Sequence, residues 1–338
     1  MSLRKKPGLT ISSATVEQPT GKPFFSLSTQ AMVTQNQSIM LDANGLKNAK
    51  VPIPFSDLTE VKVLGNGSFG VVYLVKDKTG QEFALKEIRI TEDPEVQKNI
   101  YRELHSYLDY AHKHIVQTFN VYFLDGMKVN VLLELCKYGS AKDLQKRLKS
   151  QKFNENCIGI LAIDILRALV YVHNKKIIHR DIKPDNILIA ENGDCKLADF
   201  GVATSVLVHD ENQAQQTFAG SISYMAPERI QSETYTESSD IWSLGVSFVE
   251  LLMGRFPYGE LKDIWNAINL VVKGPAPLLN ENMGYSKYCV EFINAMLEKD
   301  VSQRVNAQQL LDMTFCKMYL KKEGELRQKF AKWIKDNI

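Results

Sequence analysis

Two short polar segments, residues 179–186 and residues 199–201, constrain this chain more than any other feature of its sequence. They read HRDIKPDN and DFG, and they supply a candidate base, a cation that can contact phosphate and two oxygen ligands for a metal, namely Asp181, Lys183, Asn186 and Asp199. Phosphoryl transfer depends on such a set, because its catalysis consists mainly of positioning and of neutralising phosphate charge. An Asp- and Asn-rich turn between two strands is the structural alternative. Further motifs, which follow the required order along the chain, argue against that alternative.

These two segments resemble the catalytic and metal-binding loops of the eukaryotic protein kinases. The resemblance implies that Asp181 accepts or orients the proton of the substrate hydroxyl and that Lys183 contacts the transferred phosphoryl group. It also implies that Asn186 and Asp199 hold Mg²⁺ and leave coordination positions for water and for phosphate oxygens of ATP. The expected cofactors are therefore ATP and Mg²⁺, and the expected reaction is direct in-line transfer without a covalent enzyme intermediate.

A glycine-rich loop at residues 65–70 precedes these segments. Glycine lets the backbone approach phosphate closely and adopt torsions that other residues avoid. Apolar alternating runs at residues 58–64 and 71–75 flank the loop and predict strand–turn–strand, whereas a dinucleotide-binding loop needs strand–turn–helix. Residues 66–68 also form a glycosylation sequon, which matters only in a secreted chain. The kinase resemblance assigns ATP contacts to Gly65, Asn66, Gly67, Ser68, Phe69, Gly70 and Val72.

Lys86 is the next candidate, on a strand predicted over residues 83–88. Alternation places Ala84 and Lys86 on one face of that strand, where an exposed edge lysine is the ordinary interpretation. Its spacing from the glycine-rich loop matches the kinase lysine that grips the α- and β-phosphates. In that family the lysine pairs with a helix carboxylate, and Glu103 stands at the matching position, beside the apolar stripe of a helix predicted to begin near Asp93. A solvated surface acid is the alternative for Glu103.

The resemblance also implies the adenine pocket and two structural supports. Residues 134–136 are expected to form the hinge whose backbone binds adenine, with a gatekeeper before it. The ATP-binding residues expected in this region and on the preceding strand are Ala84, Lys86, Leu133, Glu134 and Cys136. Glu228 and Arg304 are expected to form a buried ion pair that anchors the activation segment. Asp240 is expected to brace the backbone of the catalytic loop from a buried helix.

The composition limits the classes of partner. The chain has 338 residues with 41 basic and 39 acidic side chains, and this near balance shows no nucleic-acid footprint. Its five cysteines are scattered without metal-binding spacing and are interpreted as reduced, intracellular thiols. The most apolar stretch, residues 158–172, is interrupted by Asp164 and Arg167 and predicts a mostly buried helix. We therefore expect no nucleic acid, no membrane insertion and a cytoplasmic location, with the nucleus as a second compartment.

The expected fold class is α+β, with the bilobal protein kinase fold over residues 56–316. A small strand-rich N-lobe with one helix is predicted over residues 56–136, and a larger, mainly helical C-lobe over residues 137–316. Residues 1–50 are polar without sustained periodicity and are predicted to be mostly disordered. The tail, residues 317–338, is predicted to be helical and to pack on the large lobe rather than on a partner helix. The apolar positions at helical spacing are Leu326, Phe330, Trp333 and Ile334.

Within the kinases, the chain resembles the MAP kinase kinases, dual-specificity enzymes that phosphorylate Thr and Tyr in the activation loop of a MAP kinase. The resemblance lies in residues 223–230, 239–250 and 254–258, together with a serine/threonine-type catalytic loop. It implies a MAP kinase substrate, an upstream MAP kinase kinase kinase and a scaffold as partners. Another serine/threonine kinase of a signalling cascade is the first alternative. A pseudokinase scaffold is the second, and it is disfavoured because none of its typical losses occurs at Lys86, Asp181, Asn186 or Asp199.

Residues 4–11 carry a basic cluster, a short spacer and an apolar–x–apolar motif. In an extended chain Leu9 and Ile11 point the same way and can enter adjacent pockets, while the lysines meet an acidic patch. This pattern resembles the docking peptide with which MAP kinase kinases hold MAP kinases. A solubilising basic terminus or a localisation signal is the alternative. The expected docking residues are Arg4, Lys5, Lys6, Leu9 and Ile11.

A regulatory switch is expected downstream of the metal-binding loop. Arg180 precedes the catalytic aspartate, and a phosphate on the activation segment could compensate its charge. Thr217 matches the second activating site of the family, whereas Gln213, four residues earlier, cannot be phosphorylated. We therefore expect Thr217 to be the main regulatory phosphosite, with Asp210 and Glu211 supplying part of the negative charge constantly.

Overall fold

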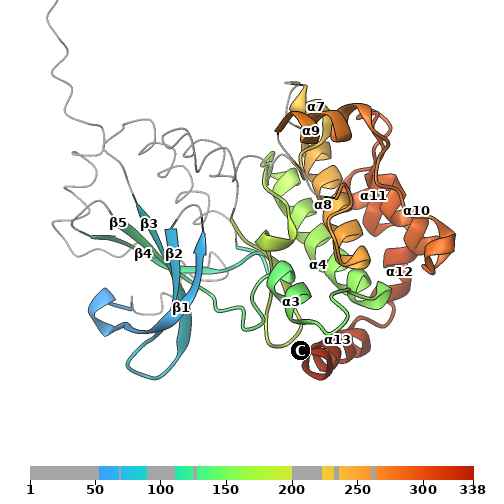
Figure 1. Cartoon of the computed structure of the whole chain (residues 1–338). Helices are drawn as coiled ribbons and strands as arrows, with labels where there is room; N and C mark the ends of the chain where they lie inside the picture. The colour runs from blue at the N-terminus through green and yellow to red at the C-terminus, as the bar shows by residue number, and fades with distance from the viewer. Residues whose placement is uncertain are drawn as a thin grey trace, which may run out of the picture. The chain divides into compact units, whose positions relative to one another are not determined.

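The computed structural model describes residues 53–67, 70–89, 111–124, 128–199, 223–231, 236–259 and 264–338. The N-terminal segment, with the candidate docking residues, lies outside these ranges. So does the helix that was predicted to begin near Asp93. In the described parts, the strands of a single sheet come early in the chain and helices dominate the later part (Figure 1).

One five-stranded sheet carries the glycine-rich loop and Lys86. All of its neighbouring strands pair antiparallel, in the order β1-β2-β3-β5-β4. The register joins Gly67 to Gly70 at the turn between the first two strands, which confirms the predicted strand–turn–strand. Its strands are β1 (Thr59–Gly67), β2 (Gly70–Lys76), β3 (Glu82–Arg89), β4 (Thr118–Leu124) and β5 (Lys128–Leu133).

The sheet is covered on both faces at β3. Phe83 and Leu85 belong to an apolar cluster with residues of β2, β4 and β5. Ala84 and Lys86, which alternation places on the opposite face, are also buried. A lysine in this central strand is therefore not the exposed edge residue of the alternative interpretation.

Helices and one short hairpin form the rest of the described chain. The hairpin, β6 (Ile187–Ile189) and β7 (Cys195–Leu197), follows the turn η2 (Pro184–Asn186) and leads directly to Asp199. A π-helical turn, Asn269–Lys273, continues α9. The helices are α3 (Ala141–Arg147), α4 (Glu155–Asn174), α7 (Pro227–Ile230), α8 (Glu237–Met253), α9 (Ile264–Ile268), α10 (Lys287–Met296), α11 (Ala307–Leu311), α12 (Thr314–Leu320) and α13 (Glu323–Asn337).

Local sequence explains where α4 begins and where α8 ends. Asn154 caps α4 by accepting a hydrogen bond from the backbone N–H of Cys157. Gly254 ends α8 in the left-handed conformation, with φ at 77°, and its N–H donates to the carbonyl of Glu250. Both helices are apolar around most of their circumference, which is typical of helices buried in a core.

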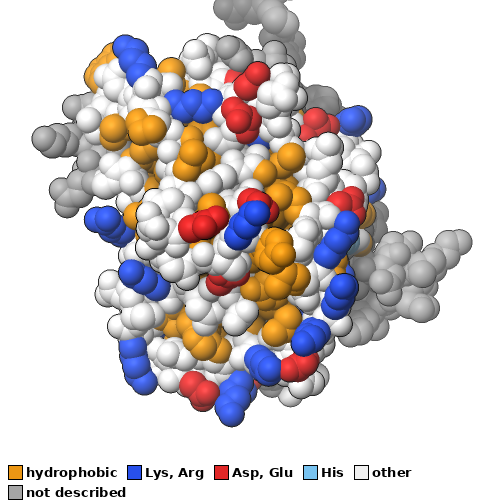
Figure 2. All heavy atoms as spheres, turned by 90° about the vertical axis from the view of Figure 1, so that its right-hand side faces the viewer, with side chains coloured by type: hydrophobic (Ala, Val, Ile, Leu, Met, Phe, Trp, Pro, Cys, Tyr) orange, Lys and Arg blue, Asp and Glu red, His pale blue; other side chains and the backbone are white. Residues whose placement is uncertain are grey.

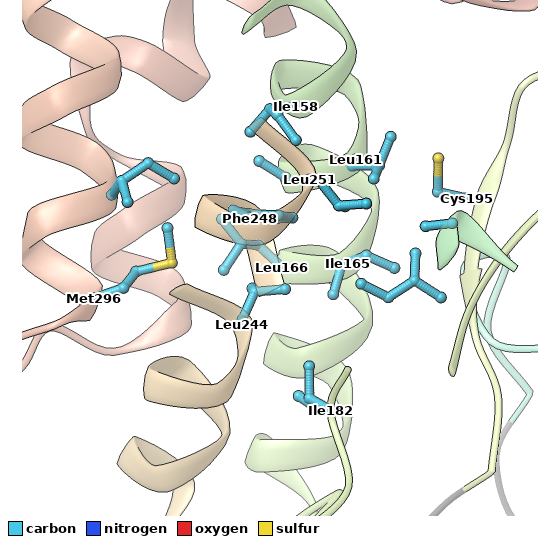
Figure 3. Packing of buried hydrophobic residues seen from close by; sticks show 14 of the residues in the cluster. Ile158, Leu161, Ile165, Leu166, Ile182, Cys195, Leu244, Phe248, Leu251 and Met296 are labelled. Carbon is cyan, nitrogen blue, oxygen red and sulfur yellow. The ribbon is translucent and has the colours of Figure 1, made fainter. Parts of the chain in front are cut away.

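The main core lies between α4 and α8. Figure 3 shows Leu161, Ile165 and Leu166 of α4 among Leu244, Phe248 and Leu251 of α8, with Met296 of α10 beside them. By length and composition α4 could cross a membrane, but 78% of its most apolar window is buried inside this fold. It therefore has the character of a core helix, as the sequence predicted.

The tail forms α13 and joins the same core. Phe330 and Ile334 are buried in it, and Leu326 and Trp333 pack against it. The surface of the helical part is mixed. On the face shown in Figure 2, basic side chains line the edges and hydrophobic side chains gather near the middle.

Candidate active site

The catalytic-loop residues predicted from sequence lie in mutual contact. Lys183 Nζ donates to both carboxylate oxygens of Asp181, at 3.0 and 2.8 Å. The turn η2 brings Asn186 back to the same residue, so that its Nδ2 donates to the Asp181 carbonyl at 2.7 Å and to Oδ2 at 2.9 Å. The carboxylate of Asp181 is therefore held by two side chains from its own loop.

Asp240 fixes the backbone of this loop from α8, as predicted. Its buried carboxylate accepts the backbone N–H of His179 at 2.8 Å and that of Arg180 at 2.9 Å. His173 Nε2 lies 2.9 Å from the same carboxylate. These contacts compensate the burial of a charge that would otherwise be costly.

His179 links the catalytic loop to the segment predicted to bind metal. Its ring is buried, and burial lowers its pKa, which favours the neutral form. A neutral imidazole has one donor and one acceptor. Nε2 lies 3.0 Å from the carbonyl of Ala198, and Nδ1 accepts the backbone N–H of Asp181 at 3.3 Å. The ring thus spans from the residue before Asp199 to Asp181.

Asp199 meets Lys86 across the site. Their Oδ1 and Nζ atoms are 2.7 Å apart, with Lys86 buried and Asp199 partly exposed. The family resemblance predicted a pair between Lys86 and Glu103, and Glu103 lies outside the described residues. Register explains the position of Lys86, which stands opposite Val72 on one side and Val131 on the other.

Backbone torsions at the site are unusual. Arg180 and Asp199 have φ angles of 72° and 57°, in the left-handed region that few non-glycine residues adopt. Such conformations are held by surrounding contacts and cluster at functional sites. The contacts here are those of Asp240 to Arg180 and of Lys86 to Asp199.

The glycine-rich loop approaches β3 closely. Gly70 has φ at 141°, and a Cβ placed on it would lie 1.8 Å from the carbonyl oxygen of Glu87. No other residue type fits there without displacing the strand. Gly65, Asn66 and Gly67 lie in β1, whereas Ser68 and Phe69 fall outside the described residues.

The predicted adenine-pocket residues converge at the end of β5. Ala84 pairs with Leu133 in the sheet, and both Leu133 and Ala198 pack against a buried cluster that contains Cys136. Glu134 connects this hinge to the hairpin, because Lys196 Nζ lies 2.8 Å from its carboxylate. Burial raises the pKa of Cys136 to about 12, so its thiol is protonated at neutral pH and unreactive.

A divalent ion fits the oxygen ligands present. The amide nitrogen of Asn186 donates to Asp181. The amide oxygen of Asn186 is therefore the atom that can coordinate a metal ion. With the carboxylate of Asp199 this makes two hard oxygen donors. Among the described residues no group of three or more His, Cys, Asp or Glu side chains could form a metal cage. Mg²⁺ at phosphate-transfer sites needs none, because phosphate and water complete its shell.

The predicted anchor pair is confirmed. Arg304 donates to Glu228 through Nη1 and Nη2, at 2.8 and 3.1 Å, and both side chains are buried. Ser239 Oγ also donates to Glu228, at 3.0 Å. This network ties α7 to the start of α8.

A second anchor was not predicted. Glu250 of α8 is fully buried, forms an ion pair with Lys142 of α3 and accepts the hydroxyl of Tyr224. Burial and the neighbouring carboxylate raise the pKa of Tyr224. The one sequence signal was a glutamate inside the apolar run of a buried helix. Its partners could not be inferred from spacing.

The remaining predicted site residues lie outside the described residues. They are Arg4, Lys5, Lys6, Leu9, Ile11, Ser68, Phe69, Glu103 and Thr217.

Comparison with known proteins gives concordant matches. The family model described as protein kinase domain matches residues 58–316. Mitogen-activated protein kinase kinase 1 of Arabidopsis thaliana is 35% identical over 287 residues, covering 82% of this chain and 79% of the relative. Mitogen-activated protein kinase kinase 2 of the same plant is 36% identical over 282 residues, covering 81% and 76%. The MAP kinase kinase MKK1/SSP32 of Saccharomyces cerevisiae is 34% identical over 309 residues, covering 88% and 59%.

Proposed function

Since the chain belongs to the protein kinase family, among its MAP kinase kinases, we propose that it phosphorylates a threonine and a tyrosine in the activation loop of a MAP kinase. Members of this family use ATP and a divalent metal ion. The choice of substrate rests on the relatives, and one observation carries the phosphoryl-transfer part of the proposal: Lys86 contacts Asp199, and Asp181 contacts Lys183 and Asn186. A phosphoryl-transfer site needs both.

The metal ion would be held by the carboxylate of Asp199 and the amide oxygen of Asn186, and Mg²⁺ suits such hard ligands. When bound, it would neutralise charge on the phosphates. Lys86 and Lys183 bring two further positive charges to the site. Asp181 receives the proton of the substrate hydroxyl, and its contacts with Lys183 and Asn186 orient its carboxylate.

The adenine ring is assigned to the side chains of Val72, Ala84 and Leu133, with the backbone of residues 134–136 as its hydrogen-bonding edge. The sheet register supports this, because Ala84 pairs with Leu133 and lies next to Lys86. The glycine-rich loop is assigned to the phosphates from its sequence and from its place at the turn between β1 and β2, where Gly67 pairs with Gly70.

Asp181→Ala tests the mechanism directly. The purified protein is incubated with catalytically inactive MAP kinases and MgATP, and phosphate transfer is measured. Loss of the base should slow transfer by about 10²- to 10⁴-fold. Asp185→Ala is the matched control, because Asp185 lies in the same loop with an exposed side chain. Near-wild-type transfer by folded Asp181→Ala protein would refute the assignment.

Regulation and docking are proposed from sequence alone. Phosphorylation of Thr217 by an upstream kinase is the proposed switch, and residues 4–11 are the proposed docking peptide for the MAP kinase. A cytoplasmic location with access to the nucleus is proposed with them. After Thr217, the described chain resumes at residue 223. Two contacts hold it there: Tyr224 donates to Glu250, and Glu228 pairs with Arg304. Phosphosite mapping after activation by an upstream kinase tests the switch, and occupancy elsewhere with Thr217 empty would reject it.

A further inference from the structure

The two charges that interrupt the apolar helix α4 both have partners on α13. Asp164 is fully buried, and an uncompensated carboxylate there would be very costly. Arg327 compensates it with two parallel hydrogen bonds, at 2.6 and 2.7 Å. The helix that carries Arg327 lies beyond residues 58–316, which the family model matches.

The second charge of α4 extends this pair into a chain. Arg167 donates to both carboxylate oxygens of Glu323, at 2.8 and 2.9 Å. Arg327 donates to the same carboxylate at 2.9 Å. Hydrogen bonding to Arg167, and then to Arg327, lowers the pKa of Glu323 to about 2. The alternating chain Arg167–Glu323–Arg327–Asp164 thus fixes α13 on α4.

Asp164 also holds the start of β7. The backbone N–H of Cys195 donates to its Oδ2 at 2.9 Å. His114 Nδ1 lies 3.0 Å from the carbonyl of Cys195 and 3.4 Å from Asp164. Leu197 then donates its N–H to the carbonyl of His114 at 2.9 Å. Both ends of the strand are therefore set by groups that contact Asp164.

Arg327 also touches the turn that precedes this strand. Nη1 donates to the carbonyl of Gly193 at 3.2 Å and lies 3.0 Å from Oδ1 of Asp194. A Cβ on Gly193 would lie 3.2 Å from the carbonyl of Arg327, so the turn and α13 are in close contact. One guanidinium thereby joins the turn, α4 and, through Asp164, the strand that ends two residues before Asp199.

We propose that Arg327 is a positioning residue for phosphoryl transfer, which acts through Asp164 and β7 to place the carboxylate of Asp199. The proposal rests on the metal-binding role assigned to Asp199 above. It makes α13 part of the catalytic apparatus rather than an appended tail. Lysine cannot replace this arginine fully, because an ammonium lacks the planar fork that serves both carboxylate oxygens and the turn.

The test compares Arg327→Lys and Arg327→Gln with Lys329→Gln. Lys329 lies on the same helix, and its pair with Glu325 is mostly exposed, at 67% and 57% for the two side chains. Each protein is assayed well below its unfolding midpoint, with rates normalised to folded protein. We expect Arg327→Gln to raise the Mg²⁺ concentration for half-maximal transfer, or to lower kcat/KM for ATP, by about 10- to 100-fold. The values for Arg327→Lys should lie between those of wild type and Arg327→Gln, and the values for Lys329→Gln should match wild type.

Hydrogen exchange of the protein without nucleotide or metal gives a second reading. The amides of Cys195 and Leu197 should exchange about tenfold faster in Arg327→Lys than in Lys329→Gln. This measurement is independent of activity, so it still judges the coupling if wild type transfers no phosphate or if Arg327→Gln fails to fold. Unchanged exchange at β7 would overturn the proposal. So would a variant with a lower unfolding midpoint but wild-type metal dependence and kcat/KM on the folded fraction.

Discussion

Lys86 shows at the level of a single residue how fold and chemistry coincide. Its ammonium is buried in the central strand of the sheet, 2.7 Å from the carboxylate of Asp199. A buried ammonium is costly unless an anion compensates it. We therefore expect Lys86 to serve phosphate binding and the pairing with Asp199 rather than stability.

Lys86→Met should abolish most transfer and leave the fold intact. Methionine has a similar length and suits a buried site, whereas the loss of one positive charge at the phosphates should cost at least about 100-fold in rate. The measurement is kcat with a MAP kinase substrate, alongside a thermal unfolding curve. Lys76→Met, at a partly exposed position of the adjacent strand, is the control. Wild-type rates in Lys86→Met would contradict the role of Lys86.

His112 makes the stability of the protein dependent on pH. Burial, followed by the charge of His114, lowers the pKa of His112 to about 4 from an ordinary 6.5. The ring stacks on Tyr171, with centroids 5.0 Å apart. Below pH 6.5 the unfolded chain binds a proton that the folded chain does not, so this contribution is complete above pH 6.5 and is lost as pH falls toward 4.

His112→Gln should therefore flatten the loss of stability on acidification. The free energy of unfolding, measured with urea at pH 7.5 and pH 5, should fall less in the variant than in wild type. The burial of His114 lowers its pKa in the same direction, so some dependence should remain. An equal fall in both proteins would show that His112 is not the group responsible.

Whole elements differ in how far sequence predicts them. β2 and α4 were predictable because alternation and apolar runs record local burial. β1 was predictable from the same alternation, although its apolar residues Val61, Val63 and Leu64 are exposed. The Glu228–Arg304 pair was predictable only because the family resemblance supplies it. Its two residues are 76 positions apart in the chain. Spacing alone carries no information at that range.

Contacts that lie outside the family pattern were not predictable from sequence. Asp164 stood out as a charge in an apolar run, yet its partner Arg327 lies 163 positions later. Glu250 is likewise a charge in an apolar run, but the sequence does not identify its partners, because Lys142 and Tyr224 reach it only in the folded chain. In each case burial of a charge implies a compensating group, but only packing identifies it.

Arg304→Met tests the anchor between elements. Removing the guanidinium leaves Glu228 buried with only Ser239 as hydrogen-bond donor of the original set, and such a break should cost about 3–5 kcal/mol of unfolding free energy. Combining it with Glu228→Gln should recover part of the loss. Urea unfolding measures both, with Lys287→Met at an exposed helix pair as the control. A loss below about 1 kcal/mol in Arg304→Met would contradict the anchor.

At the scale of the whole molecule, a net charge of only +2 offers no broad electrostatic means of choosing a partner. Basic and hydrophobic side chains share the face shown in Figure 2. Selection of a MAP kinase is therefore expected to depend on a local element, and the proposed docking peptide at residues 4–11 is the candidate.

Replacing Leu9 and Ile11 with alanine should raise the KM for the MAP kinase about tenfold or more, because a tethered second contact raises the local substrate concentration. The rate on a generic protein substrate should not change. Thr10→Ala is the control, because Thr10 points away from Leu9 and Ile11 in an extended chain. Equal losses on both substrates would reject docking.

The central claim is that this chain phosphorylates both a threonine and a tyrosine in one MAP kinase activation loop. Mapping phosphosites on catalytically inactive MAP kinases, after incubation with MgATP and wild-type, Thr217→Glu or Asp181→Ala protein, tests it most directly. We expect paired threonine and tyrosine phosphorylation in one activation loop, increased by Thr217→Glu and absent with Asp181→Ala. Phosphorylation of serine or threonine alone, or autophosphorylation alone, would contradict it.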